Sequence, residues 1–214
     1  MVFGEADRSV GTQTLRMDIY TPVGDTETDR PVFVLAFGGG FTEGSRRDPL
    51  IVSVAQSLAR RGYVTASIDY RFFESAPVTE DDADIAIIEA MYDMRAAVRF
   101  LRQDAEGADV YGTRDDAIFV GGVSSGGIMA SFAGALDLGD GLSTNVRNFL
   151  TAHNGTAGDS STNTGISSDI QGVFSISGGL TDFLWIDVNT APIYAWRSSP
   201  MGQRPSSRRK FPEF

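Results

Sequence analysis

The fold is decided by one stretch of the sequence, AIFVGGVSSGGIMA (residues 117–130). Its first residues are continuously apolar, as in a strand buried on both faces of a sheet. Its last residues suit a helix, and Gly122-Val123-Ser124-Ser125-Gly126 lies between the two. In this G-x-S-x-G pattern a sharp, strained turn lifts the serine hydroxyl above the sheet edge, and the glycines leave room for it. The stretch predicts Ser124 as a nucleophile; the alternative is a glycine-rich turn without chemistry.

A second glycine motif, Phe37-Gly38-Gly39-Gly40-Phe41, follows the apolar run PVFVLAF (31–37). Three glycines let the backbone approach a substrate carbonyl closely and present N–H groups to its oxygen. The expected donors to an oxyanion are the amides of Gly39, Gly40 and Ser125. A tight loop and a phosphate cradle are alternatives, but neither G-x-G-x-x-G nor a G-K-S/T ending is present to support the phosphate cradle.

Around these motifs, strands alternate with helices. Further strands are expected at YVTASIDY (63–70), GVFSIS (172–177) and APIYAW (191–196), with a half-exposed edge strand at TQTLRMDIYTP (12–22). Helices are expected from Asp48-Pro49 to Gly62, after Asp81-Asp82, and after Ser124, whereas the polar residues 154–168 predict a loop. The acidic residues Asp81, Asp82 and Asp84 are interpreted as compensating the dipole at the start of the long helix rather than as a metal site. The pattern predicts an α/β fold, with a mainly parallel central sheet and helices on both faces, in one domain over residues 1–196.

Composition excludes several classes of site. The chain has no cysteine and one histidine, so disulfides and thiolate or histidine metal sites are not expected, and neither is a cofactor. The net charge of −10 argues against a nucleic-acid partner. No apolar run is long enough for a membrane helix, and no signal peptide is visible at the N-terminus. A cytoplasmic protein and a secreted one that has lost its signal peptide both fit.

The sequence resembles the carboxylesterases of the hormone-sensitive-lipase type in the α/β-hydrolase superfamily. The likeness is carried by LRMDIYTP, PVFVLAFGGGF, GYVTASIDYR, FVGGVSSGGIMA and SDIQGVFSISG, and extends to about Trp196. It implies a serine esterase with small ester substrates, in which HGGGF-like and GDSAGG-like segments supply the oxyanion hole and the nucleophile. Two residues depart from the family pattern: Phe37 stands where histidine is common, and Ser125 replaces the usual alanine.

The resemblance also implies an acidic residue and a histidine after the strand that APIYAW matches. Here APIYAW leads into RSSPMGQRPSSRRKFPEF (197–214), which has five basic residues against Glu213 and contains neither an HGTxD-like segment nor a histidine. We interpret this segment as the product of a frameshift or deletion, so that the fold is incomplete at its C-terminus; a natural basic tail without fixed structure is the alternative. Missing elements would uncover an edge and an apolar face of the sheet, so we expect a homo-oligomer.

His153 is the remaining candidate for a general base. No position in the family corresponds to it, although convergent triads occur in several chain orders. The acids that could orient it are Asp137, Asp159, Asp182 and Asp187, and nothing in the sequence selects among them. A role in loop packing or at the surface is the simpler reading. The sequence therefore predicts a weak or impaired serine esterase, with a catalytically inactive α/β-hydrolase fragment as the alternative and nucleic-acid binding through the basic tail as a third class.

Overall fold

The computed structural model describes residues 1–24, 26–161, 163–180 and 185–196. Seven strands form one sheet in the order β1-β2-β4-β3-β5-β6-β7. They are β1 (Val2–Asp7), β2 (Thr12–Tyr20), β3 (Arg30–Ala36), β4 (Val64–Ile68), β5 (Thr113–Val123), β6 (Gly172–Ile176) and β7 (Ile193–Trp196). The pairings β1–β2 and β2–β4 are antiparallel, and the others are parallel. The mainly parallel α/β sheet is therefore confirmed.

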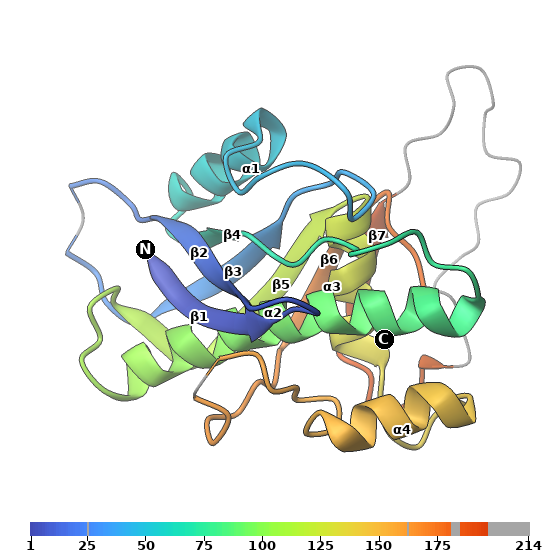
Figure 1. The fold of residues 1–214 in the computed structure, drawn as a ribbon. Helices are drawn as coiled ribbons and strands as arrows, with labels where there is room; N and C mark the ends of the chain where they lie inside the picture. The colour runs from blue at the N-terminus through green and yellow to red at the C-terminus, as the bar shows by residue number, and fades with distance from the viewer. Residues whose placement is uncertain (25, 162, 181–184, 197–214) are drawn as a thin grey trace, which may run out of the picture.

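The described residues form four α-helices: α1 (Pro49–Ala59), α2 (Glu80–Glu106), α3 (Ser125–Ala135) and α4 (Thr144–Ala152). The first three pack against the sheet, and α4 packs against α2. Helix α1 lies on one side of the sheet, and α2 and α3 lie on the other (Figure 1). Helix α1 begins as predicted, since Asp48 accepts a hydrogen bond from the Leu50 amide and Pro49 occupies the first turn. Helix α2 begins slightly earlier than expected, at a capping box formed by Thr79 and Asp82.

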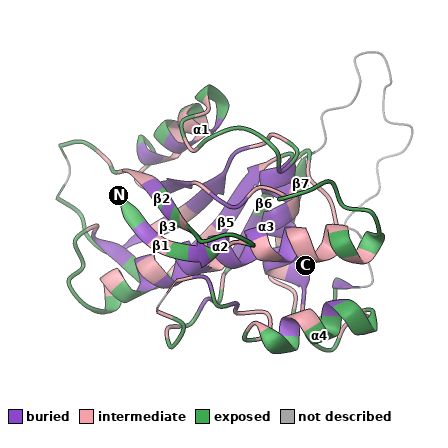
Figure 2. Cartoon of the chain, in the orientation of Figure 1, coloured by how far each residue is buried: buried purple, intermediate pink, exposed green. Residues whose placement is uncertain are grey.

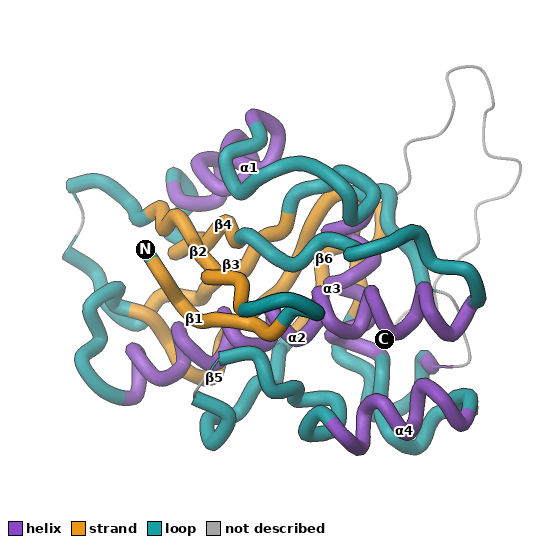
Figure 3. Tube along the Cα trace, in the orientation of Figure 1, coloured by secondary structure: helices purple, strands orange, loops and turns teal. Residues whose placement is uncertain are grey.

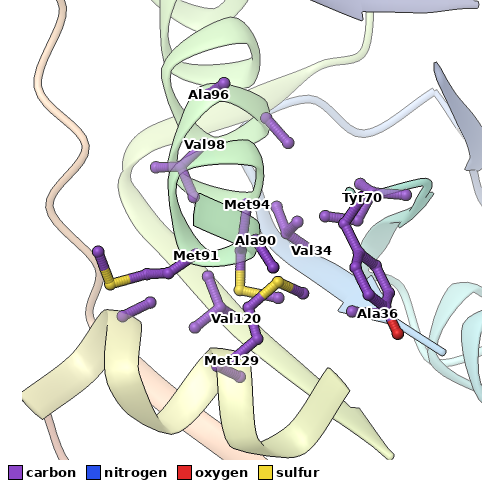
Figure 4. Packing of buried hydrophobic residues seen from close by; sticks show 14 of the residues in the cluster. Val34, Ala36, Tyr70, Ala90, Met91, Met94, Ala96, Val98, Val120 and Met129 are labelled. Atoms are coloured by element: carbon purple, nitrogen blue, oxygen red, sulfur yellow. The ribbon is translucent and has the colours of Figure 1, made fainter. Parts of the chain in front are cut away.

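The core lies mainly between the sheet and the α2–α3 layer. Strand β4 is buried throughout and β3 is buried or half-buried, whereas β5 is buried mainly over its second half, and the loops are more exposed (Figure 2). Val34 and Val120 are aligned on neighbouring strands, and Met94 and Met129 are buried between these strands and the two helices (Figure 4). Interdigitated apolar side chains hold the carboxyl ends of β3 and β5 in fixed register, which is what a site at that edge of the sheet requires.

Two elements were not predicted from the sequence. Strand β1 pairs with β2, so β2 is an interior strand and its assignment as an edge strand is wrong. A register shift between Val2 and Gly4 interrupts the alternation that would have identified β1. Helix α4 is mostly polar and buries only Val146 and Leu150, which is too weak a periodic signal to distinguish it from a loop.

The predicted loop over residues 154–168 is confirmed for its described residues, 154–161 and 163–168 (Figure 3). Arginine side chains from α2 fix its path through hydrogen bonds. Arg99 donates to the carbonyl oxygens of Ala157 and Ser160, and Arg102 donates to those of Ser167 and Asp169. No helix within the described ranges is both long and apolar enough to cross a membrane. The interpretation of residues 197–214 concerns a segment outside the described residues.

Candidate active site

Ser124 occupies a strained turn between β5 and α3. Its backbone has φ 52° and ψ −118°, a conformation that costs a non-glycine residue about 1–3 kcal/mol. The amide of Ser124 donates to the carbonyl oxygen of Ile176 on β6 at 2.8 Å, which anchors the turn to the neighbouring strand. The residue itself is exposed. The turn therefore presents the Ser124 side chain at the carboxyl edge of the sheet, as the motif predicted.

Two of the glycines around this turn are required by close backbone contacts. A Cβ atom on Gly122 would lie 2.5 Å from the carbonyl carbon of Gly126. A Cβ atom on Gly126 would lie 2.3 Å from the carbonyl oxygen of Ala36 on β3. Neither distance leaves room for a side chain. The absence of side chains at these two glycines lets the backbones of β3, β5 and the start of α3 pack directly against one another.

The glycine loop after β3 lies against Ser124. A Cβ atom on Gly38 would be 3.2 Å from the Cβ atom of Ser124. Gly39 and Gly40 both have positive φ angles, of 139° and 63°. The carbonyl oxygen of Gly39 accepts hydrogen bonds from the amides of Thr42 and Glu43, which closes the loop into a turn. The two glycine motifs, distant in sequence, are thus brought together.

Tyr70, which belongs to neither glycine motif and was not predicted as a site residue, contacts both motifs. Its hydroxyl donates to the carbonyl oxygen of Phe37 at 3.0 Å and lies 3.2 Å from the Ser125 hydroxyl. The Tyr70 ring stacks on that of Phe37, with centroids 4.5 Å apart, and meets Phe41 edge-on. Burial raises the pKa of Tyr70 to about 12, so its phenol is neutral at ordinary pH.

His153 lies in a different region from Ser124. It follows α4, its Nδ1 atom is 2.8 Å from Oδ2 of Asp159, and its ring stacks on Phe149 with centroids 4.3 Å apart. It lines a cavity of about 770 Å³. We call this cavity the His153 cavity; besides His153 and Asp159, it is lined by β1, the loop after β4 and the first half of α2, including Glu5, Asp7, Arg71, Glu89 and Tyr92. Neither Ser124 nor the glycine loop is among its lining residues.

Of the four acids considered for orienting His153, the structure selects Asp159. Asp137 accepts a hydrogen bond from the amide of Gly139, and Asp187 accepts one from the amide of Asn189, each within its own turn. Asp182 lies outside the described residues. Within the described part of the chain, no hydrogen bond joins the Ser124 hydroxyl to a histidine or a carboxylate. The predicted nucleophile Ser124 thus lies beside the glycine loop, whereas His153 lies elsewhere.

Comparisons with known proteins agree with this architecture. The family model described as BD-FAE matches residues 17–162. No curated protein matches the chain. Among solved structures, esterase Est2 of the Planctomycetes species Thermogutta terrifontis with propionate bound is 23% identical, with a TM-score of 0.55 over 83% of this chain and 53% of that one.

Two other structures of the same esterase give similar values. With butyrate bound, it is 22% identical, with a TM-score of 0.56 over 86% of this chain and 56% of that one. The form phosphorylated by paraoxon is 22% identical, with a TM-score of 0.56 over 83% of this chain and 56% of that one. At such identities the likeness establishes the fold. The chain spans about half the length of these structures.

Proposed function

Because this chain belongs to the BD-FAE family, an α/β-hydrolase-type family, we propose that it is a serine esterase acting on carboxylic esters through Ser124. The observation that carries the proposal is the backbone of Ser124, strained at φ 52° and ψ −118° and exposed beside the glycine loop. Strain of this kind persists only where the surrounding packing enforces it, and here that packing places a hydroxyl at an open edge of the sheet.

In the proposed reaction, Oγ of Ser124 attacks the ester carbonyl carbon and loses its proton. The negative charge that develops on the carbonyl oxygen is held by the amides of Gly39, Gly40 and Ser125. The alcohol leaves with a proton, and water then hydrolyses the acyl-serine to release the acid. The Ser125 amide suits this role because it lies in the first turn of α3, where N–H groups have no acceptor within the helix and the helix dipole favours negative charge.

The expected rate is low. A serine hydroxyl is a poor nucleophile without a base, and none of the described residues contacts Ser124 as a base would. Binding and an oxyanion hole alone leave roughly 10³–10⁴-fold acceleration over water in a protease whose triad has been removed. The separation of His153 from Ser124 favours the second candidate, a catalytically inactive hydrolase-like protein.

Hydrolysis of p-nitrophenyl butyrate distinguishes these two candidates. We expect slow turnover by the wild-type protein and only the buffer rate for Ser124→Ala. The matched control is Ser53→Ala, which removes an exposed hydroxyl from α1 and should keep the wild-type rate. Equal rates for wild type and Ser124→Ala would favour the inactive protein.

We also propose that the protein forms a homo-oligomer through the β6–β7 side of the sheet. Phe174, Tyr194 and Trp196 are 46%, 67% and 70% exposed, and the register Phe174↔Tyr194 and Ile176↔Trp196 places all four side chains on one face. Exposed apolar faces and terminal strands favour association, and a second copy offers the same strand for pairing. Light scattering at micromolar concentrations should detect an oligomer that Trp196→Asp weakens; a monomeric wild type contradicts the proposal.

A further inference from the structure

We propose that Tyr70 is a positioning residue that holds the two halves of the oxyanion site in register. One half is the glycine loop that begins at Phe37, and the other is the first turn of α3, which begins at Ser125. This inference rests on the proposed function, since the oxyanion site has a role only if Ser124 reacts. The proposal gives the Ser125 hydroxyl a role, whereas the family resemblance implied a role only for the Ser125 amide.

The direction of the two hydrogen bonds follows from the chemistry of the groups. The carbonyl oxygen of Phe37 can only accept, so the single hydroxyl proton of Tyr70 is donated to it over 3.0 Å. Tyr70 must then act as acceptor in its 3.2 Å contact with Ser125, and the Ser125 hydroxyl is the donor. The chain therefore runs in one direction, from Ser125 through Tyr70 to Phe37, and each bond polarises the next.

This chain acts on the backbone that carries the proposed donors. The peptide between Phe37 and Gly38 is planar, so holding the Phe37 carbonyl toward Tyr70 fixes the orientation of the Gly38 amide and the start of the glycine loop. The same carbonyl oxygen would lie 2.6 Å from a Cβ atom on Gly126, so it is confined between Tyr70 and the start of α3. A displacement of Tyr70 would therefore shift the glycine loop relative to Ser125.

The surroundings of Tyr70 restrict its own movement. The side chain is 1% exposed and lies beside Ala36 at the end of β3 (Figure 4). Its ring contacts those of Phe37, Phe41 and Phe72, and Phe41 stacks in turn on Phe73, with ring planes 4° apart. The hydroxyl is thus held in place by packing, which is what a positioning residue needs in order to act on a loop.

The test uses Tyr70→Phe and Ser125→Ala, singly and together, with Tyr92→Phe as the matched control. Tyr92 is also 1% exposed and also donates to a backbone carbonyl, that of Gly155 at 2.7 Å, but it lines the His153 cavity. With p-nitrophenyl butyrate we expect kcat to fall about 10-fold in Tyr70→Phe, with KM unchanged, because misplaced groups lose rate rather than binding. The double variant should be no slower than the slower single variant, and Tyr92→Phe should match the wild type.

Amide hydrogen exchange provides a second readout that does not need turnover. Tyr70→Phe should exchange faster than wild type in two separate segments, 37–44 and 124–128, and Tyr92→Phe in neither. A wild-type kcat in Tyr70→Phe, a rise in KM alone, or multiplicative effects in the double variant would overturn the proposal. If wild type and Ser124→Ala are equally inert, the proposed function fails by itself; exchange then decides, and unchanged exchange in either segment overturns the positioning role.

Discussion

The Ser124 turn and the His153 cavity each hold one of the groups that a serine hydrolase combines. At the Ser124 turn, backbone packs against backbone, with a Cβ position on Gly126 only 2.3 Å from the Ala36 carbonyl oxygen. At the His153 cavity, side chains hold the structure together through ion pairs and hydrogen bonds, such as the 2.8 Å contact between His153 and Asp159. In the first region a strained serine has no base in contact with it among the described residues, and in the second a histidine is paired with a carboxylate away from that serine.

The difference shows what each kind of packing can enforce. Close backbone contacts fix a conformation that an isolated chain would avoid, so the Ser124 turn can store strain at an exposed position. Hydrogen-bonded side chains satisfy buried polar groups and hold loops, but they leave charges that respond to pH and to substitution. Substitutions in the two regions should therefore have different effects.

The largest effect is expected at the His153 cavity, from Arg71→Met. Nη2 of Arg71 is 3.0 Å from Oδ1 of Asp93, whose side chain is 0% exposed. Removing the cation leaves a buried carboxylate without its partner, which typically destabilises a protein by about 3–5 kcal/mol. Urea unfolding should detect the loss, and Arg71→Met/Asp93→Leu should recover part of it. The control Arg114→Met breaks an exposed pair with Asp116, and an equally large loss there would contradict the account.

A smaller loss is expected at the Ser124 turn, from Gly126→Ala. The added methyl group overlaps the Ala36 and Phe37 carbonyl oxygens, and overpacking of this kind costs about 1–3 kcal/mol. Because both carbonyls belong to the strand and loop beside Ser124, esterase activity should fall as well. Gly141→Ala is the matched control, since nothing lies within 4 Å of its added atom. Indistinguishable unfolding curves for the two variants would show that the turn is not held by these contacts.

The His153 cavity should also show a pH dependence through Glu89. The pKa of Glu89 lies above its ordinary value of 4.5, mainly because the carboxyl group is buried. A raised folded-state pKa means that the contribution of Glu89 to stability is fully present below pH 4.5 and is lost as pH rises through the folded-state pKa. Glu89→Gln cannot ionise, so the variant should gain stability relative to wild type as the pH rises from about 4 to 7.

Unfolding curves measured at several pH values test the direction of this change in relative stability. Glu74→Gln serves as the opposite control, because hydrogen bonds from Ser9 lower the pKa of Glu74. Its wild-type contribution is present above the ordinary pKa and is lost as the pH falls. A pH-independent difference between wild type and Glu89→Gln would contradict the prediction.

The smallest effect is expected on turnover in His153→Gln. His153 contacts Asp159 and Phe149 and lies away from the glycine loop, so hydrolysis of p-nitrophenyl butyrate should continue at the wild-type rate. A fall to the rate of Ser124→Ala would make His153 the base and join the two regions into one site.

The sequence was sufficient to predict those parts of the structure that depend on local packing. The strands around β3 and β5, the cap at Asp48 and the Ser124 turn were predicted because apolar runs, prolines and glycines act on their immediate neighbours. The pairing of β1, the contact between His153 and Asp159 and the Tyr70 hydrogen bonds depend on residues far apart in the chain. Tyr70 and Ser125 are separated by 55 positions, and no local sequence pattern indicates that their hydroxyl groups will be in contact.

The central claim is that Ser124 is the reactive group and that the His153 cavity is not part of its site. Intact mass measurement after incubation with paraoxon tests it most directly. The Ser124 oxygen would displace 4-nitrophenolate and keep one diethylphosphoryl group. We predict a single adduct, mapped to Ser124, in wild type and in His153→Gln, and none in Ser124→Ala. Wild-type protein without an adduct, or an adduct on another residue, would contradict the account.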